Sequence, residues 1–188
     1  DCSPDNSTQI IEKYIIDNPD LNIHLFHLEK NRGLSVVRNT AIEKSSGKYI
    51  YMLDSDDYIS NDCIEKLVEN SEKYMCEITV GETISEYEDT GERKELFKIQ
   101  SPKQLIEGNK EIFEGFINGY WPVIGPNKLY LKNFLEKNNL KFVEGLLNED
   151  ELWTFQICSL AKIAYIELNA TYKYIKRDDS ITTSPTNF

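Results

Sequence analysis

Several features that assign proteins to common classes are scarce or absent in this sequence. It contains only 4 cysteines in 188 residues and no Cys-x-x-Cys pair, which argues against a zinc site or a disulfide framework and favours reduced thiols in a cytoplasmic protein. No run comes near the ~18 consecutive apolar residues of a membrane span. The first residues show neither the basic start nor the apolar core of a signal peptide. No Gly-x-Gly-x-x-Gly or Walker loop occurs, so dinucleotide-binding and P-loop chemistries lose support.

Positive charge is also scarce. The 21 Lys and Arg residues against 32 Asp and Glu residues give a formal net charge of -11 at pH 7. A nucleic-acid-binding protein needs a basic stripe to replace the counterions of the phosphates, so we expect no nucleic-acid partner. A phosphate-bearing substrate would be repelled by the overall field and would need a local cation at its binding site.

Hydrophobic residues make up 40% of the chain, enough for the core of one α/β domain. Short apolar runs alternate with helical spacings of apolar residues, and this order predicts a mostly parallel sheet covered by helices. The charged stretch 82–98 is expected to form an exposed hairpin or loop. The expected strands are residues 23–28, 48–53, 77–81, 163–168 and 171–175. The expected helices are one between residues 34 and 47, one that starts after residue 61 or 62, and residues 111–117, 128–137 and 149–160.

Three aspartates, Asp54, Asp56 and Asp57, follow directly after an apolar run. Ligands of open α/β sheets bind beyond the carboxyl ends of the strands. Each pair of carboxylates at ~4 Å costs about 1 kcal/mol in water and ~4 kcal/mol in a partly screened site. A divalent cation removes this repulsion and supplies the positive charge that a diphosphate needs, and Mg²⁺ or Mn²⁺ suits oxygen ligands. The alternative is a solvated acidic turn in which Asp57 or Asp62 caps the next helix.

Two other acidic motifs fit the sequence less well. An EF-hand loop begun at Asp54 would have Glu65 at its twelfth position, but Ile59 stands where a glycine is needed. A haloacid-dehalogenase-type phosphatase also has Asp-x-Asp after an apolar strand, but Tyr58 stands where a Thr or Val is expected. A metal-dependent phosphatase is therefore a remote alternative.

Five stretches of the chain resemble, in order, motifs of the family 2 glycosyltransferases, which have the GT-A fold. The family's Gly-Leu-Ser-x-x-Arg-Asn-x-Gly helix has its counterpart at residues 33–41, where Ala41 replaces the final glycine. Cys2 likewise replaces a glycine in the Asp-Gly-Ser-x-Asp-Asn-Ser stretch. The five stretches are residues 1–7, 31–42, 46–58, 126–130 and 149–150. The resemblance runs almost from end to end and is weakest at residues 82–107.

On the donor side, the resemblance implies a nucleotide-diphosphate sugar, most often uridine-linked, with Mn²⁺ or Mg²⁺ as the cofactor. Asp54 and Asp56 would contact both the donor and the metal, and Asp57 would complete the metal site. Asp1 and Arg38 would contribute to donor binding. Read without the resemblance, Arg38 is an ordinary polar residue of an amphipathic helix.

On the acceptor side, the resemblance implies that Asp150 is the general base of a transfer that inverts the anomeric carbon. This carboxylate would take the proton of the attacking hydroxyl, while the metal stabilises the departing diphosphate. Trp121 and Glu149 are weaker candidates for acceptor contacts, and Trp121 could equally pack in its loop. Read without the resemblance, Glu149 and Asp150 are ordinary acids at a helix start.

Together these expectations describe a hexosyltransferase that acts on a glycan or lipid-linked acceptor in cell-surface polysaccharide synthesis. The main alternative is a non-catalytic sugar-nucleotide-binding module of the same fold. We expect one continuous domain, with a partial nucleotide-sugar-binding half at residues 1–81 and an acceptor-side half with the catalytic-base helix at residues 82–188. In the family, two strands and a helix precede the counterpart of Asp1, so the fold is expected to be incomplete at its N-terminus. A cytoplasmic location, peripheral contact with the inner face of the membrane and a homo-oligomer built by exposed strands are further expectations.

Overall fold

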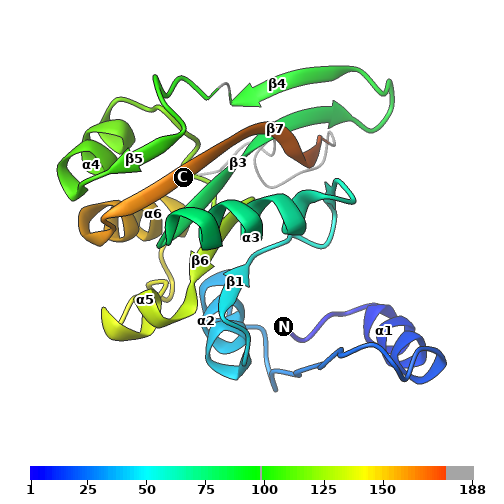
Figure 1. Cartoon of the computed structure of the whole chain (residues 1–188). Coiled ribbons are helices and arrows are strands. Elements are labelled where there is room, and N and C mark those ends of the chain that lie inside the picture. The colour runs from blue at the N-terminus through cyan, green and yellow to red at the C-terminus, as the bar shows by residue number, and fades with distance from the viewer. Residues whose placement is uncertain (98, 177–188) are drawn as a thin grey trace.

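The computed structural model describes residues 1–97 and 99–176, and its strands form one sheet. The strands are β1 (Tyr49–Tyr51), β2 (Tyr58–Ile59), β3 (Ile78–Tyr87), β4 (Arg93–Phe97), β5 (Leu105–Glu107), β6 (Lys128–Leu131) and β7 (Ile163–Lys176). Their order is β1-β6-β3-β7-β2, with β4 paired to β3 and β5 paired to β7. The long strands β3 and β7 run side by side through the middle of the molecule (Figure 1).

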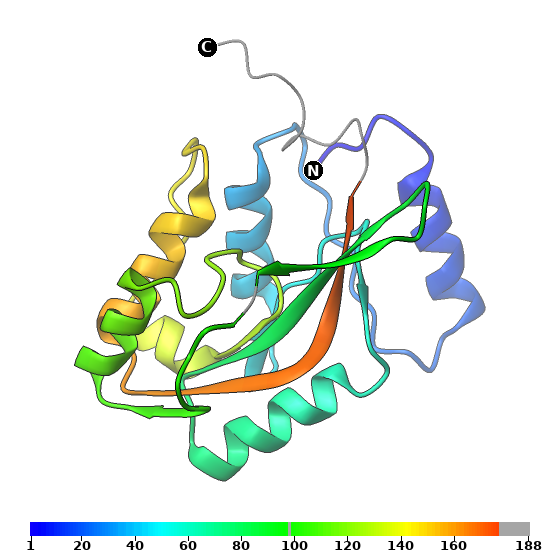
Figure 2. The same cartoon turned by 90° about the horizontal axis from the view of Figure 1, so that it is seen from above.

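The helices are α1 (Ser7–Asp17), α2 (Leu34–Lys44), α3 (Cys63–Tyr74), α4 (Asn109–Ile117), α5 (Lys132–Lys137) and α6 (Glu149–Leu160). Helix α3 lies on one side of the β3–β7 pair, whereas α4 and α6 lie on the other (Figure 2). Helix α1 stands apart from the sheet and has no buried residue (Figure 1). Within the described residues, no helix has the length and apolar character needed to cross a bilayer.

The core lies on both faces of the sheet because side chains alternate along each strand. On β6, Leu129 packs with Cys63 and Leu67 of α3. Tyr130, the next residue, points to the opposite face, where its ring lies 5.6 Å from that of Trp153 in α6. This larger cluster on the α6 side also receives side chains from α4, α5, β1, β3 and β7. The strand β6 therefore presents Lys128 and Tyr130 to the face that α6 covers.

The sheet is mixed, which corrects the prediction of a mostly parallel one. Among the described pairings only β3 with β7 is parallel, and the remaining ones are antiparallel. When helices cover both faces of a sheet, a strand with a continuous apolar run can pair either parallel or antiparallel with its neighbour. The composition of a strand therefore does not fix its direction. The α/β class with flanking helices is confirmed.

Several predicted elements differ from the observed ones. Residues 128–137 were expected as one helix, but their first part is β6 and only the second is helical. Residues 23–28 form no strand, and the two strands expected at 163–168 and 171–175 are one strand, β7. Short apolar runs do not distinguish strand from helix by periodicity, which explains the first error. The hairpin of the stretch 82–98 is confirmed for residues 82–97 by the antiparallel pair β3–β4, but its expected exposure is not, because Thr83 and Ser85 are buried; residue 98 lies outside the described residues.

The boundary expected between two halves at Gly81 falls inside β3, so both halves share this sheet. Gly81 is also a close-contact position, since a Cβ atom there would lie 2.1 Å from Thr171 Oγ1 of β7. The part of the expected acceptor-side half at residues 177–188 lies outside the described residues.

Candidate active site

The buried guanidinium of Arg38 in α2 joins acids from two distant parts of the chain. Arg38 is 6% exposed. Its Nη1 donates to Asp150 Oδ1 at 2.5 Å and to Glu149 Oε1 at 3.1 Å. Its Nη2 donates to Asp54 Oδ1 at 3.4 Å. The acid that follows β1 and the acids at the head of α6 therefore meet at one cation, although 112 residues separate Arg38 from Asp150.

The neighbouring residues Arg38 and Asn39 of α2 have different partners: Arg38 bonds the acids, and Asn39 bonds the loop at Phe142. The Asn39 side chain makes two hydrogen bonds with the backbone of Phe142, one to its carbonyl and one from its N–H, both 2.9 Å long. The ring of Phe142 in turn stacks on Trp153, with 4.2 Å between centroids. The Arg38 guanidinium carbon lies 5.2 Å from the Phe142 centroid, a cation–π distance. Asn39 thus fixes an aromatic ring that Arg38 rests on.

Asp1 supports the loop that leads into α2. Its two carboxylate oxygens accept hydrogen bonds from the backbone N–H groups of Arg32 and Gly33, at 2.8 and 2.9 Å. Gly33 has φ 84°, a left-handed conformation that favours glycine, and it immediately precedes the helix. Asp1 therefore fixes the start of the helix that carries Arg38, and its predicted contact with the donor stays a prediction.

The three aspartates after β1 have different surroundings. Asp57 is 9% exposed and accepts hydrogen bonds from the Tyr172 hydroxyl at 2.5 Å and the Ile175 N–H at 2.9 Å. Its carboxylate thus anchors the acidic turn to β7. Burial raises the pKa of Asp54, and the charge and hydrogen bond of Arg38 oppose that shift. Asp56, by contrast, is exposed.

The described residues contain no group of three or more His, Cys, Asp or Glu side chains arranged to hold a metal ion. Asp57 is turned into the fold and bonded to β7, and the prediction that Asp54, Asp56 and Asp57 bind a metal together stays a prediction. Mg²⁺ is commonly held by one or two carboxylates together with substrate phosphates. Asp54 and Asp56 fit that smaller demand, since Asp56 is exposed and the Asp54 side chain is 38% exposed.

Glu149 and Asp150 occupy the first turn of α6, after Asn148, which has φ 57°. Their side chains are 16% and 22% exposed, so they are not the solvated helix-end acids of the alternative interpretation. Gly125 lies against Asp150: a Cβ atom there would be 2.6 Å from Asp150 Oδ1. The close approach of this backbone to the acid requires glycine, and the sequence pattern gave no indication of it.

Trp121, for which sugar contact and loop packing were both predicted, lies in the interior. It is 4% exposed and belongs to the hydrophobic core. Its ring lies so close to Gly115 of α4 that a Cβ atom there would be 2.4 Å away. The packing interpretation of Trp121 therefore agrees with its position.

In the sequence, Asn127 and Lys128 belong to the family-like stretch 126–130, and both are 1% exposed in the structure. Asn127 links two strands: its amide donates to Thr83 Oγ1 of β3 at 3.0 Å and its carbonyl oxygen accepts from Thr171 Oγ1 of β7 at 2.8 Å. Lys128 donates to the carbonyl of Ile124. The available indication in the sequence was a polar pair directly before the apolar residues of β6.

Comparison with known proteins identifies the family of this chain. The profile of the family described as "Glycosyl transferase family 2" matches residues 1–138. The chain is 27% identical over 184 residues to "Uncharacterized glycosyltransferase YibD" of Escherichia coli (strain K12), covering 97% of this chain and 53% of that protein. It is 27% identical over 195 residues to "Poly(ribitol-phosphate) beta-N-acetylglucosaminyltransferase TarS" of Staphylococcus aureus (strain MW2), covering 100% of this chain and 32% of that protein.

The fold has a solved counterpart as well. The crystal structure of S. aureus TarS 1-349 in complex with UDP-GlcNAc superposes with a TM-score of 0.79 at 24% sequence identity, covering 99% of this chain and 50% of that one. At this identity the likeness concerns the fold. The chain spans about half, or less, of the length of these relatives. With the family profile matching most of its length, the chain belongs to glycosyl transferase family 2 and has the GT-A fold.

Proposed function

We propose that the protein is an inverting glycosyltransferase that moves a sugar from a uridine-diphosphate donor to a glycan or lipid-linked acceptor of a cell-surface polysaccharide. The single observation that carries the proposal is the meeting of Asp54 and Asp150 at Arg38. It brings the donor-side acid and the predicted base to one place, as the reaction requires. Family membership argues against the phosphatase alternative. Relatives named for transfer to poly(ribitol-phosphate), and a fold relative solved with UDP-GlcNAc, support the donor and acceptor classes.

Asp150 suits the role of general base because one of its oxygens is anchored. Oδ1 accepts the hydrogen bond of Arg38, which fixes the orientation of the carboxylate. Among the described residues, the hydrogen bond of Asp150 is made by Oδ1, which leaves Oδ2 to face an acceptor hydroxyl. In the proposed step Oδ2 takes the hydroxyl proton as that oxygen bonds to the anomeric carbon. The bond from this carbon to the diphosphate breaks on the opposite side, which inverts the configuration.

The donor side is assigned to Asp54 and Asp56. These two carboxylates would hold the Mn²⁺ or Mg²⁺, and Asp57 would only keep their turn on β7. The metal, when bound, neutralises the negative charge that develops on the leaving diphosphate. Arg38 bonds both Asp54 and Asp150, and it would support the donor side of the site by holding these acids in place. Donor contacts of Asp1 and Arg38, acceptor contacts of Glu149, peripheral membrane contact and self-association stay predictions.

The test is Mn²⁺-dependent release of UDP from a panel of UDP-sugars, with the Asp150→Asn variant beside the wild type. Loss of a general base typically costs about 10²–10⁴-fold in rate, so the variant should lose turnover while keeping its affinity for the donor. Glu149→Gln is the matched control, because Glu149 shares the helix turn and the Arg38 contact but has no proton to remove in this scheme. Its turnover should fall far less.

Calorimetric titration with the donor separates the proposal from its main alternative. A non-catalytic binding module would bind UDP-sugar tightly in both wild type and Asp150→Asn and would release no UDP in either. Equal turnover in wild type and Asp150→Asn would exclude Asp150 as the base.

A further inference from the structure

A short backbone segment, residues 123–125, lies under the candidate active site and is held by buried side chains. All three of its carbonyl groups accept a hydrogen bond from a side chain of α6 or β6. The donors are Thr154 Oγ1 to Val123 at 2.7 Å, Lys128 Nζ to Ile124, and the Tyr130 hydroxyl to Gly125 at 3.3 Å. Three consecutive carbonyls bonded in this way leave the segment little freedom to move.

Segment 123–125 supports the pair formed by Arg38 and Asp150. An ideal Cβ atom on Gly125 would lie 2.6 Å from Asp150 Oδ1 and 3.1 Å from Arg38 Nη1. The Gly125 backbone is therefore in contact with the two groups that define the candidate site. A shift of the segment toward the acid would collide with it, and a shift away would leave it unsupported.

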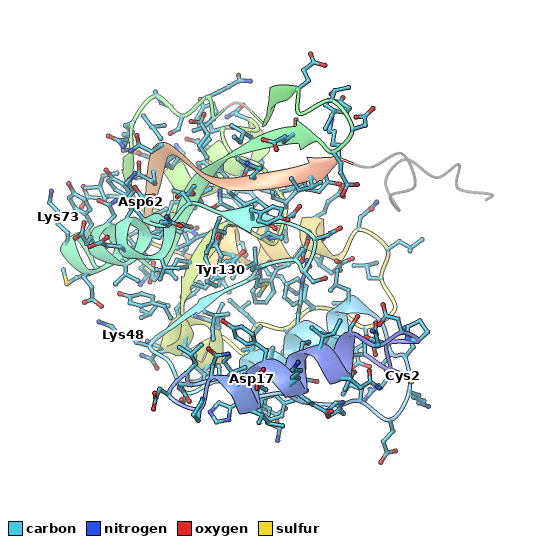
Figure 3. All side chains as sticks on the ribbon, turned by 90° about the vertical axis from the view of Figure 1, so that its right-hand side faces the viewer. Cys2, Asp17, Lys48, Asp62, Lys73 and Tyr130 are labelled. Carbon is cyan, nitrogen blue, oxygen red and sulfur yellow. The ribbon has the colours of Figure 1, made fainter. Side chains whose placement is uncertain are left out.

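Lys128 differs from the two other residues that hold the segment, because it carries a charge. Thr154 and Tyr130 satisfy their carbonyls with neutral hydroxyl groups, and a buried ammonium is far more costly to desolvate. Lys128 is 1% exposed and projects from β6 to the α6 face, as Tyr130 does. Figure 3 shows Tyr130 in the interior of the molecule, in contrast to Lys48 near its edge.

The protonation of Lys128 depends on its burial and on groups of two helices. Burial lowers the pKa of Lys128 to about 8. The carboxylate of Asp150 and the thiol of Cys158, both on α6, oppose this shift, whereas Arg38 on α2 adds to it. Asp150 thus faces two cations, Arg38 through a direct hydrogen bond and Lys128 at longer range.

We propose that Lys128 is a positioning residue for Asp150: its ammonium fixes segment 123–125 beneath the acid and places a second positive charge in the interior beside it. This inference rests on the proposed function, in which Asp150 is the general base. Lys128 belongs to the family-like stretch 126–130, and in this proposal it influences the reaction without touching the substrate. Loss of the ammonium is expected to displace the carboxylate, and misplacement by about 1 Å can cost on the order of 10²-fold in rate.

The test compares Lys128→Met with Lys132→Met. Lys132 is a matched control because it also donates to a backbone carbonyl, that of Ser45 at 2.5 Å, whereas its carboxylate partner is Glu136 of α5 and not Asp150. We expect Lys128→Met to lower kcat by about 10²-fold while the KM for the donor changes less than about twofold. Lys132→Met should keep wild-type kcat. In the wild type kcat should also fall above pH 8, as Lys128 loses its proton, and this decline should be absent from Lys128→Met.

A crystal structure of Lys128→Met gives a readout that needs no turnover. Movement of segment 123–125 together with Asp150 is the expected result, and an unmoved Asp150 would overturn the inference. If Lys128→Met does not fold, Gly125→Ala tests the same support from the other side, since its Cβ would press on the acid. Wild-type kcat in a folded Gly125→Ala or Lys128→Met protein would refute the inference but leave the proposed function standing. Absence of UDP release from the wild type would refute the proposed function, and the crystal structure would still decide the position of Asp150.

Discussion

Replacing Arg38 with methionine removes the cation on which the candidate site is built, and the cost should depend on pH. The substitution keeps the apolar stem, so the loss is chiefly that of the guanidinium. Asp54, Glu149 and Asp150 would lose their shared partner, and their side chains are 38%, 16% and 22% exposed. Breaking a buried ion pair by removing one partner costs about 3–5 kcal/mol. Because these acids are partly solvated, we expect the lower end, about 3 kcal/mol at pH 8.

The sign of the pH dependence follows from Asp54. Burial already raises its pKa above the ordinary value of 3.8, and Arg38 is what opposes the shift. Without Arg38 the folded variant would bind a proton more tightly than the unfolded chain does. Stability then falls as pH rises through the folded-state pKa, so the variant is weakest at pH 8 and recovers toward pH 5. The difference in unfolding free energy between wild type and Arg38→Met should therefore shrink on acidification.

Urea denaturation at pH 5, 6, 7 and 8, followed by tryptophan fluorescence, measures this difference. Arg32→Met is the control, because Arg32 pairs with Glu144 at 3.1 Å with both side chains well exposed. An exposed pair contributes less than about 1 kcal/mol, so this variant should stay close to wild type at every pH. A loss in Arg38→Met that is below about 1 kcal/mol, or equal at pH 5 and pH 8, would refute the electrostatic account of the site.

Three further predictions concern the buried Trp121, the hydrogen bond of Tyr172 to Asp57, and the metal. Trp121→Ala should lower the unfolding free energy by about 3–5 kcal/mol, because the indole fills the core; unchanged stability with a raised acceptor KM would instead restore the sugar-stacking prediction. Tyr172→Phe removes the hydrogen bond to the buried Asp57 carboxylate and should cost about 1.5–3 kcal/mol in urea denaturation, whereas a loss within experimental error would mean that Asp57 does not depend on it. Chelation of divalent metal should stop UDP release, and Mn²⁺ should restore it. Asp56→Asn should then require more Mn²⁺ for half-maximal rate and Asp57→Asn should not, while the reverse order would return Asp57 to the metal site.

Local sequence pattern was sufficient to predict several of the strands and helices around the candidate site. The apolar run before Asp54 ends in β1, and the helices after Gly33 and Asp62 begin where capping and apolar spacing predicted. The head of α6 at Glu149 agrees with prediction as well. These features depend on neighbours in sequence, such as a glycine that stops one element or acids that favour a helix start. They can be read without knowing what the segment packs against.

Other features depend on partners that are remote in sequence. Lys128-to-Leu131 reads as part of a helix, yet it is a strand because β1 and β3 offer hydrogen bonds on both of its sides. The direction of each pairing is likewise a property of two segments, so apolar runs could not reveal that the sheet is mixed. Trp121 was ambiguous for the same reason, because only the space left beside Gly115 decides that its ring is buried.

The amino-acid order alone was enough to identify the residues that could do chemistry: aspartates at a strand end, an Arg-Asn pair on a helix and an acidic pair at the start of another. It was also enough to recognise the family to which these motifs belong. What each of these residues touches depends on the folded chain. The tertiary structure turned Asp57 inward to β7, put Lys128 and Gly125 beneath Asp150, and brought Asp54 and Asp150 to Arg38. The physical reason is that a charge is oriented and desolvated by whatever packs around it, and those neighbours come from segments far apart in the chain.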